Sequence, residues 1–153
     1  MKRLMASLLV AVPLCGLWAC TTPEAAESPE VAPPPPTMVF NIISSGEEDP
    51  HPVTMALQLA GHSLDAGRTT VLFFNVRAVT TPTTAFPADV AFGDRPIKEL
   101  LQDLMDRGAE VHVCPHCMAA MDVEEADLIP GARVTNRDLL FQHLTSNSVV
   151  FTY

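Results

Sequence analysis

Four side chains that can transfer sulfur or bind metal ions lie between positions 112 and 117 of this chain. They are His112, Cys114, His116 and Cys117, and the last three belong to a Cys-Pro-His-Cys tetrapeptide. Two thiols at this spacing can exchange disulfides, carry sulfane sulfur as a persulfide, or bind a soft metal ion. We therefore take Cys114, Cys117 and His116 as the candidate reactive residues.

The residues around the tetrapeptide predict a strand that leads directly into a helix. Val111–Val113 predicts a buried strand, and Pro115 fits the first helical position, where its missing N–H costs nothing. Pro115 also keeps Cys114 out of helical geometry, so Cys114 falls at the N-cap and Cys117 in the first turn. Unpaired N–H groups and the helix dipole favour thiolate there. We expect Cys114 to react first, Cys117 to resolve it, and His116 to help hold the reactive sulfur as thiolate.

A metal site and a structural thiol pair are the alternatives. The candidate metal ligands are His112, Cys114, His116 and Cys117. Soft ligands of this kind suit Cu(I), and no second ligand pair for a closed zinc site is evident. His51 and His143 lie too far away in the sequence to be assigned. An inert disulfide is weakly motivated, because a loop this short would restrain the unfolded chain little.

Residues 1–19 predict a lipoprotein signal peptide. Lys2 and Arg3 precede an apolar run that is short for a membrane span and has signal-peptide flanks. The run ends in Leu17-Trp18-Ala19-Cys20, which resembles a bacterial lipobox. We therefore expect lipidation at Cys20 and anchoring in the bacterial cell envelope; an ordinary cleaved secretory signal is the alternative. By analogy with proteobacterial sorting, Thr21 implies the outer membrane, with the domain facing the periplasm.

Residues 20–37 follow as a Pro-rich linker that begins at the lipidated cysteine. Its composition cannot bury a core, and its prolines favour a semi-rigid extended spacer. Such a spacer would hold the folded domain away from the membrane.

Composition and missing motifs exclude several classes of function. The 153 residues include 9 basic and 18 acidic side chains, so no basic footprint for nucleic acid exists. The chain has no G-x-S-x-G, no P-loop, no dinucleotide fingerprint and no helical His-Glu-x-x-His. If it is an enzyme at all, we expect a sulfurtransferase-like relay or a thiol oxidoreductase.

Residues 38–153 predict one α/β domain. Continuous apolar runs indicate strands that are covered on both faces, and helical periodicity fills the gaps between them. The expected strands are 38–43, 71–76, 111–113, 132–134 and 149–153, and the expected helices are 53–64, 97–105 and one capped by Thr135. This alternation predicts a three-layer α/β/α domain with a mostly parallel five-stranded sheet.

An irregular segment, residues 77–96, leaves the carboxyl end of the second expected strand. Loops of this length inside compact domains are usually functional or disordered. Ligands bind along the carboxyl edge of open α/β sheets. We therefore expect this segment to border the thiol site.

Residues 38–153 resemble the DsrE/DsrF-like family. The resemblance is carried by a set of short segments in order: Ser45-Gly46, Asp49-Pro50, Gly67 before Val71–Phe74, Arg107–Cys114 and Asp127–Val134. The resemblance implies a small α/β/α domain, often a homotrimer or homohexamer. It also implies a sulfur relay on Cys114 with no cofactor beyond the persulfide, and a sulfur-donor or thiol partner protein. Relay members often carry an Arg-Gly pair after this cysteine, where the present chain has Met121 and Asp122.

Two other functions fit the tetrapeptide. Cys-Pro-His-Cys is also the active-site sequence of the oxidising thioredoxin-like protein DsbA, which makes periplasmic thiol–disulfide exchange an alternative. A thioredoxin fold, however, places this motif after its first strand, whereas only 36 residues follow Cys117 here. A non-catalytic interaction module on a lipid tether is the other alternative.

Overall fold

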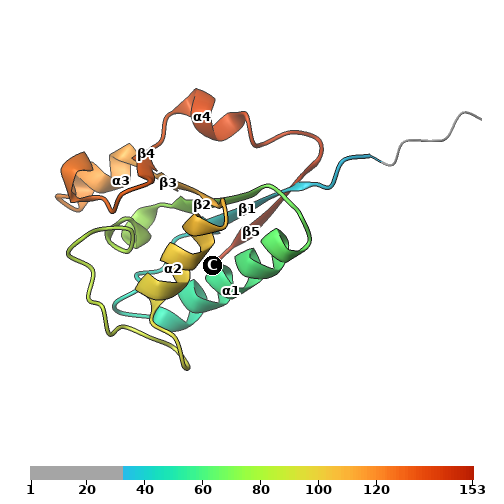
Figure 1. The fold of residues 1–153 in the computed structure, drawn as a ribbon. Coiled ribbons are helices and arrows are strands. Elements are labelled where there is room, and N and C mark those ends of the chain that lie inside the picture. The colour runs from blue at the N-terminus through green and yellow to red at the C-terminus, as the bar shows by residue number, and fades with distance from the viewer. Residues whose placement is uncertain (1–32) are drawn as a thin grey trace, which may run out of the picture. The chain divides into compact units, whose positions relative to one another are not determined.

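A five-stranded sheet, parallel throughout, forms the centre of the domain in the order β4-β3-β2-β1-β5 (Figure 1). The strands are β1 (Thr37–Ile42), β2 (Thr70–Phe74), β3 (Glu110–Val113), β4 (Ala132–Val134) and β5 (Ser148–Thr152). The helices are α1 (Pro50–Asp65), α2 (Ile97–Asp106), α3 (Pro115–Ala120) and α4 (Arg137–Phe141), with short 3₁₀ turns η1 (Val76–Thr80) and η2 (Glu125–Asp127). The predicted α/β class and five strands are confirmed, and the sheet proves to be wholly parallel.

This computed structural model describes residues 33–153. The predicted signal peptide, Cys20 and most of the predicted linker lie outside the described residues. Within 33–153, no helix is long and apolar enough to cross a bilayer.

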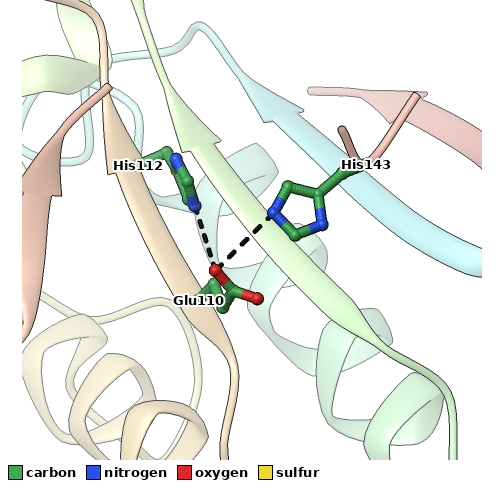
Figure 2. Close-up of side chains that lie close together, drawn as sticks. All are labelled: Glu110, His112 and His143. Atoms are coloured by element: carbon green, nitrogen blue, oxygen red, sulfur yellow. Dashed lines mark hydrogen bonds and ion pairs between the residues drawn. The ribbon is translucent and has the colours of Figure 1, made fainter. Parts of the chain in front are cut away.

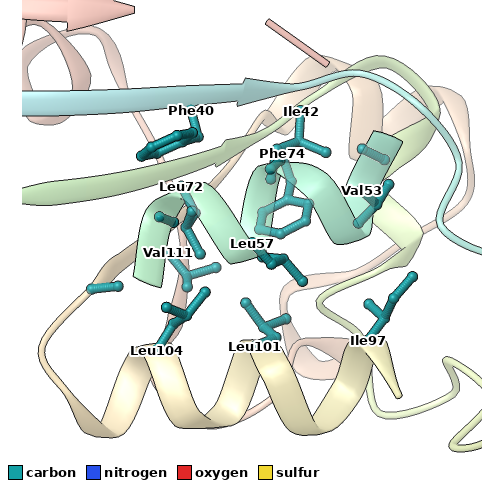
Figure 3. Packing of buried hydrophobic residues seen from close by; sticks show 14 of the residues in the cluster. Phe40, Ile42, Val53, Leu57, Leu72, Phe74, Ile97, Leu101, Leu104 and Val111 are labelled. Atoms are coloured by element: carbon teal, nitrogen blue, oxygen red, sulfur yellow. The ribbon is translucent and has the colours of Figure 1, made fainter. Parts of the chain in front are cut away.

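The main core lies between the sheet and the pair α1 and α2, which pack side by side on one face (Figures 1 and 3). Alternate strand residues point into it, because side chains alternate between the two faces of a strand. The largest buried members include Phe40, Ile42, Leu57, Leu72, Phe74, Ile97 and Leu101. The amphipathic spacing of the two helices therefore predicts the buried face correctly.

The opposite face of the sheet is covered by α4 and the chain that follows it (Figure 1). Val39 and Val71 are buried on this face, while Val150 of the edge strand β5, the neighbour of Val39, is 51% exposed. The domain is thus a three-layer α/β/α arrangement whose second helical layer is thin. This face also carries His112, because His112 alternates with the core residues Val111 and Val113 along β3.

The cap of α4 differs from the prediction. Asn136, not Thr135, precedes the helix, and its side-chain oxygen accepts a hydrogen bond from Leu139 N at 2.9 Å. Thr135 is buried and contacts His112 instead. Both residue types cap helices well, so the sequence could not separate two adjacent candidates.

Candidate thiol site

Cys114 lies where β3 ends and α3 begins, as the sequence predicts. Its N–H donates to Phe74 O at 3.0 Å, which extends the pairing with β2 by one residue, and its carbonyl accepts from Met118 N at 2.9 Å. Its backbone is extended, with φ −72° and ψ 117°, and Pro115 opens the helix behind it. The predicted N-cap at Cys114 is confirmed, and it places the thiol at the carboxyl edge of the sheet.

Cys114 and Cys117 are both free thiols and both half-buried. They pack against the edge of the main hydrophobic core, and the Cys114 thiol is close enough to affect the ionisation of Cys117. Two adjacent thiols, partly exposed at a sheet edge, can form persulfides or a mutual disulfide.

Burial opposes the thiolate that the helix start is predicted to favour at Cys117. Burial raises the pKa of the Cys117 thiol, and the hydrogen bond with the Cys114 thiol raises it further. The backbone N–H of Val76 opposes this rise in part. The partly buried, apolar surroundings of the Cys117 sulfur therefore disfavour its thiolate.

Val76 has an unusual backbone beside this site. Its φ is +53°, a left-handed conformation that β-branched residues rarely adopt, and its side chain is 52% exposed. Packing of the side chain therefore does not account for the strain. Strained residues of this kind cluster at functional sites, where the surrounding structure holds them in place. The strain supports a functional role for the Cys117 environment.

The irregular segment 77–96 borders the thiol site at its start, as predicted. Val76 begins η1, which packs against α3. Further along, Pro82 O accepts from Ile129 N at 3.0 Å and Asp127 O accepts from Thr84 N at 2.8 Å, so the segment is tied to the chain after α3. A hollow of about 340 Å³ opens between them. Its lining includes Glu47, Thr80, Thr83, Phe86, Asp122 and Val123, and neither cysteine.

His112 and His116, which the sequence suggests as site residues, lie in different surroundings. His116 is exposed at the second position of α3 and makes no hydrogen bond with another residue of the described domain. Its role in holding a thiolate stays a prediction. His112 is fully buried on β3 and faces away from the main core. Within residues 33–153, therefore, His112, His116 and the two thiols do not gather around one point, as the predicted metal site would require.

His112 instead belongs to a cluster with Glu110 and His143 (Figure 2). Its Nε2 lies 3.4 Å from Glu110 Oε2, and His143 Nε2 lies 3.6 Å from the same oxygen. Burial lowers the pKa of His112, and the hydrogen bond to Glu110 opposes this in part. This cluster was not predicted from the sequence, because His143 comes from a distant segment. Glu110 and His112 at alternate strand positions were the only local signal.

Comparisons with known proteins agree with this architecture. The model of the DsrE/DsrF-like family matches residues 38–153. No curated protein matches the chain significantly.

Two solved structures share the fold. The protein of unknown function MTH1491 from Methanobacterium thermoautotrophicum is 15% identical with a TM-score of 0.60, and the match covers 77% of this chain and 99% of that one. The ychN protein from E. coli is 19% identical with a TM-score of 0.59, and the match covers 78% of this chain and 100% of that one. At these identities the two structures support the fold alone. The family match spans the whole α/β domain, including the strand that ends at Cys114, and the chain therefore belongs to the DsrE/DsrF-like family.

Proposed function

We propose that this protein carries sulfane sulfur as a persulfide on Cys114 and passes it to a partner thiol. The observation that supports this most is the pairing of two free thiols at the carboxyl edge of β3, one of them in surroundings that raise its pKa. Family membership is consistent with sulfur relay.

Loading and delivery need no oxidant. The Cys114 thiolate attacks the outer sulfur of a donor persulfide R–S–SH, the outer sulfur becomes the Cys114 persulfide, and R–SH leaves after taking up a proton. In delivery, the thiolate of an acceptor attacks the outer sulfur on Cys114. The acceptor gains the persulfide and Cys114 returns to a thiol.

Cys117 decides how long the persulfide survives. Its thiolate could attack the inner sulfur of the Cys114 persulfide, which would form a Cys114–Cys117 disulfide and release hydrogen sulfide. Only the thiolate is an effective nucleophile, and the raised pKa of Cys117 keeps that form scarce at neutral pH. The surroundings of Cys117 therefore favour a carrier over immediate release of sulfide.

Thiol–disulfide exchange is the second candidate function, supported by the same proximity of the two sulfurs. It would use the Cys114–Cys117 disulfide as the oxidised state, whereas the carrier would use the persulfide with Cys117 reduced. The two functions therefore differ in the species that accumulates after loading.

The test is to add a small-molecule persulfide to the reduced protein and follow its intact mass. A carrier gains about 32 Da per transferred sulfur, whereas disulfide formation loses about 2 Da and releases sulfide. We expect the gain in the wild type and in Cys117→Ser, and none at this site in Cys114→Ser. A loss of about 2 Da within the first measured time point at pH 7 would favour the redox function.

A further inference from the structure

Glu110, His112 and His143 place three metal-ligating atoms within 4.8 Å of one another, at a site separate from the thiols (Figure 2). Glu110 and His112 occupy alternate positions of β3, so they project from the same face of the sheet. His143 reaches them from the turn after α4. Cys114 lies four positions after Glu110, which is about 13 Å along the strand direction.

The hydrogen bonds of the cluster allow both imidazoles to present a lone pair on Nε2 to a metal ion. The Thr135 hydroxyl lies 3.0 Å from His112 Nδ1 and 3.3 Å from Asn136 O, so it can accept from Nδ1–H while it donates to the carbonyl. Without a metal ion, His112 Nε2–H donates to the Glu110 carboxylate, and metal binding would place the proton on Nδ1 instead. The side-chain amide of Gln142 lies 3.2 Å from His143 Nε2 and can donate to it.

Two imidazole nitrogens therefore converge on one carboxylate oxygen. His112 Nε2 lies 3.4 Å and His143 Nε2 lies 3.6 Å from Glu110 Oε2. A partly buried carboxylate needs a positively charged partner. In this structure the Arg133 guanidinium supplies that charge, because its Nη2 pairs with Glu110 Oε2.

We propose that Glu110, His112 and His143 form a binding site for a zinc ion, which competes with Arg133 for the Glu110 carboxylate. Two histidines and one carboxylate are a common zinc ligand set that leaves a fourth position open. Zinc bonds of about 2.0–2.1 Å in a tetrahedron place neighbouring ligands about 3.3 Å apart, close to the two separations from Glu110. The buried Thr135 hydroxyl acts as the second-shell partner that orients His112.

Arg133 must release the Glu110 carboxylate before a zinc ion can bind to it. Its side chain is 46% exposed, so the guanidinium can move into solvent when a metal ion enters. Replacing Arg133 with glutamine removes the competing charge and leaves the three ligands in place. The proposal therefore predicts a variant that binds more tightly, which a nonspecific surface site would not produce.

The test is zinc titration against a chromophoric chelator, on the full chain with all four cysteines replaced by serine. This background removes thiol binding at Cys15, Cys20, Cys114 and Cys117. We expect one zinc ion per chain. Affinity should fall at least about 100-fold in His143→Ala and about 10- to 100-fold in Thr135→Val, since loss of a second-shell partner alone has the latter effect. Arg133→Gln should bind more tightly than the background.

Cobalt provides an independent readout, because tetrahedral Co²⁺ absorbs visible light far more strongly than octahedral Co²⁺. We expect the strong spectrum in the background chain and in Arg133→Gln. No zinc binding in either chain would overturn the proposal. So would binding that neither His143→Ala nor Arg133→Gln alters, with far-UV circular dichroism confirming that the variants are folded.

Discussion

At the level of single residues, Cys114 and Cys117 differ in what surrounds their sulfur atoms. Cys114 caps a helix at the sheet edge, whereas Cys117 is half-buried and lies beside both the Cys114 thiol and the Val76 amide. In the proposed function this asymmetry separates the residue that carries sulfur from the residue that must remain a thiol.

Alkylation should reveal this difference. In Cys114→Ser, the alkylation rate of Cys117 should be low at pH 7 and rise only at higher pH than for a free thiol, whose pKa is about 8.5. The sign follows from burial, which penalises the charged thiolate and raises the pKa. Peptide mass spectrometry after timed iodoacetamide treatment measures the rate, with Cys117→Ser as the faster comparison. A Cys117 that titrates at or below the free value would contradict the account.

At the level of elements, the turn from β2 into η1 supports the thiol site at a cost in stability. Val76 at φ +53° adopts a backbone that costs roughly 1–2 kcal/mol in a residue with a Cβ, and glycine would remove that cost. Glycine is more flexible in the unfolded chain, which reduces the stability gained from relieving this strain by roughly 0.5–1 kcal/mol.

Val76→Gly should therefore stabilise the protein by about 0.5–1 kcal/mol, since the exposed side chain contributes little packing. Val76→Ala is the matched control, because it shortens the side chain but keeps a Cβ at positive φ. Urea unfolding of the three proteins measures the difference. Destabilisation in Val76→Gly alone would mean that the left-handed backbone is not strained.

The elements that the sequence predicts well are those with a strong hydrophobic pattern. The continuous apolar run Val71–Phe74 and the helical spacing of 97–105 locate β2 and α2 correctly. The predicted strand 71–76 is two residues too long, because β2 ends at Phe74 and η1 begins at Val76. The strand–cysteine–helix unit was predictable because Pro115 restricts both neighbours. The cluster of Glu110 and His143 could not be predicted from the sequence, because only the tertiary packing of the α4 segment on the sheet brings these residues together.

At the level of the whole molecule, the thinly covered sheet face is the best candidate for self-association. Val150 on the edge strand and Phe141 of α4 are 51% and 60% exposed. An apolar edge strand invites pairing with another chain. Together with family membership, this supports the expectation of a homotrimer or homohexamer.

Light scattering of the purified protein should give a trimer or hexamer, and Val150→Lys should shift it towards monomer. Met55→Lys is the control, because Met55 is 41% exposed but lies on α1, on the other side of the sheet. A wild-type monomer at micromolar concentration would refute the assembly while leaving the fold unchanged.

The proposed membrane tether is tested at the same scale. The Leu17-Trp18-Ala19-Cys20 sequence predicts that the mature protein partitions with membranes and that Cys20→Ser releases it. Cell fractionation followed by immunoblotting measures this distribution. Wild-type protein found free in the periplasmic fraction would show that the lipobox interpretation is wrong.

The central claim concerns the sulfur on Cys114, and one measurement tests it most directly. The protein is isolated from its native cells without reductant, and its intact mass is compared before and after reduction. We predict a loss of about 32 Da, with the labile sulfur located on the peptide that contains Cys114. A gain of about 2 Da, or no change, would contradict the persulfide carrier, and the gain would identify the Cys114–Cys117 disulfide as the resting state.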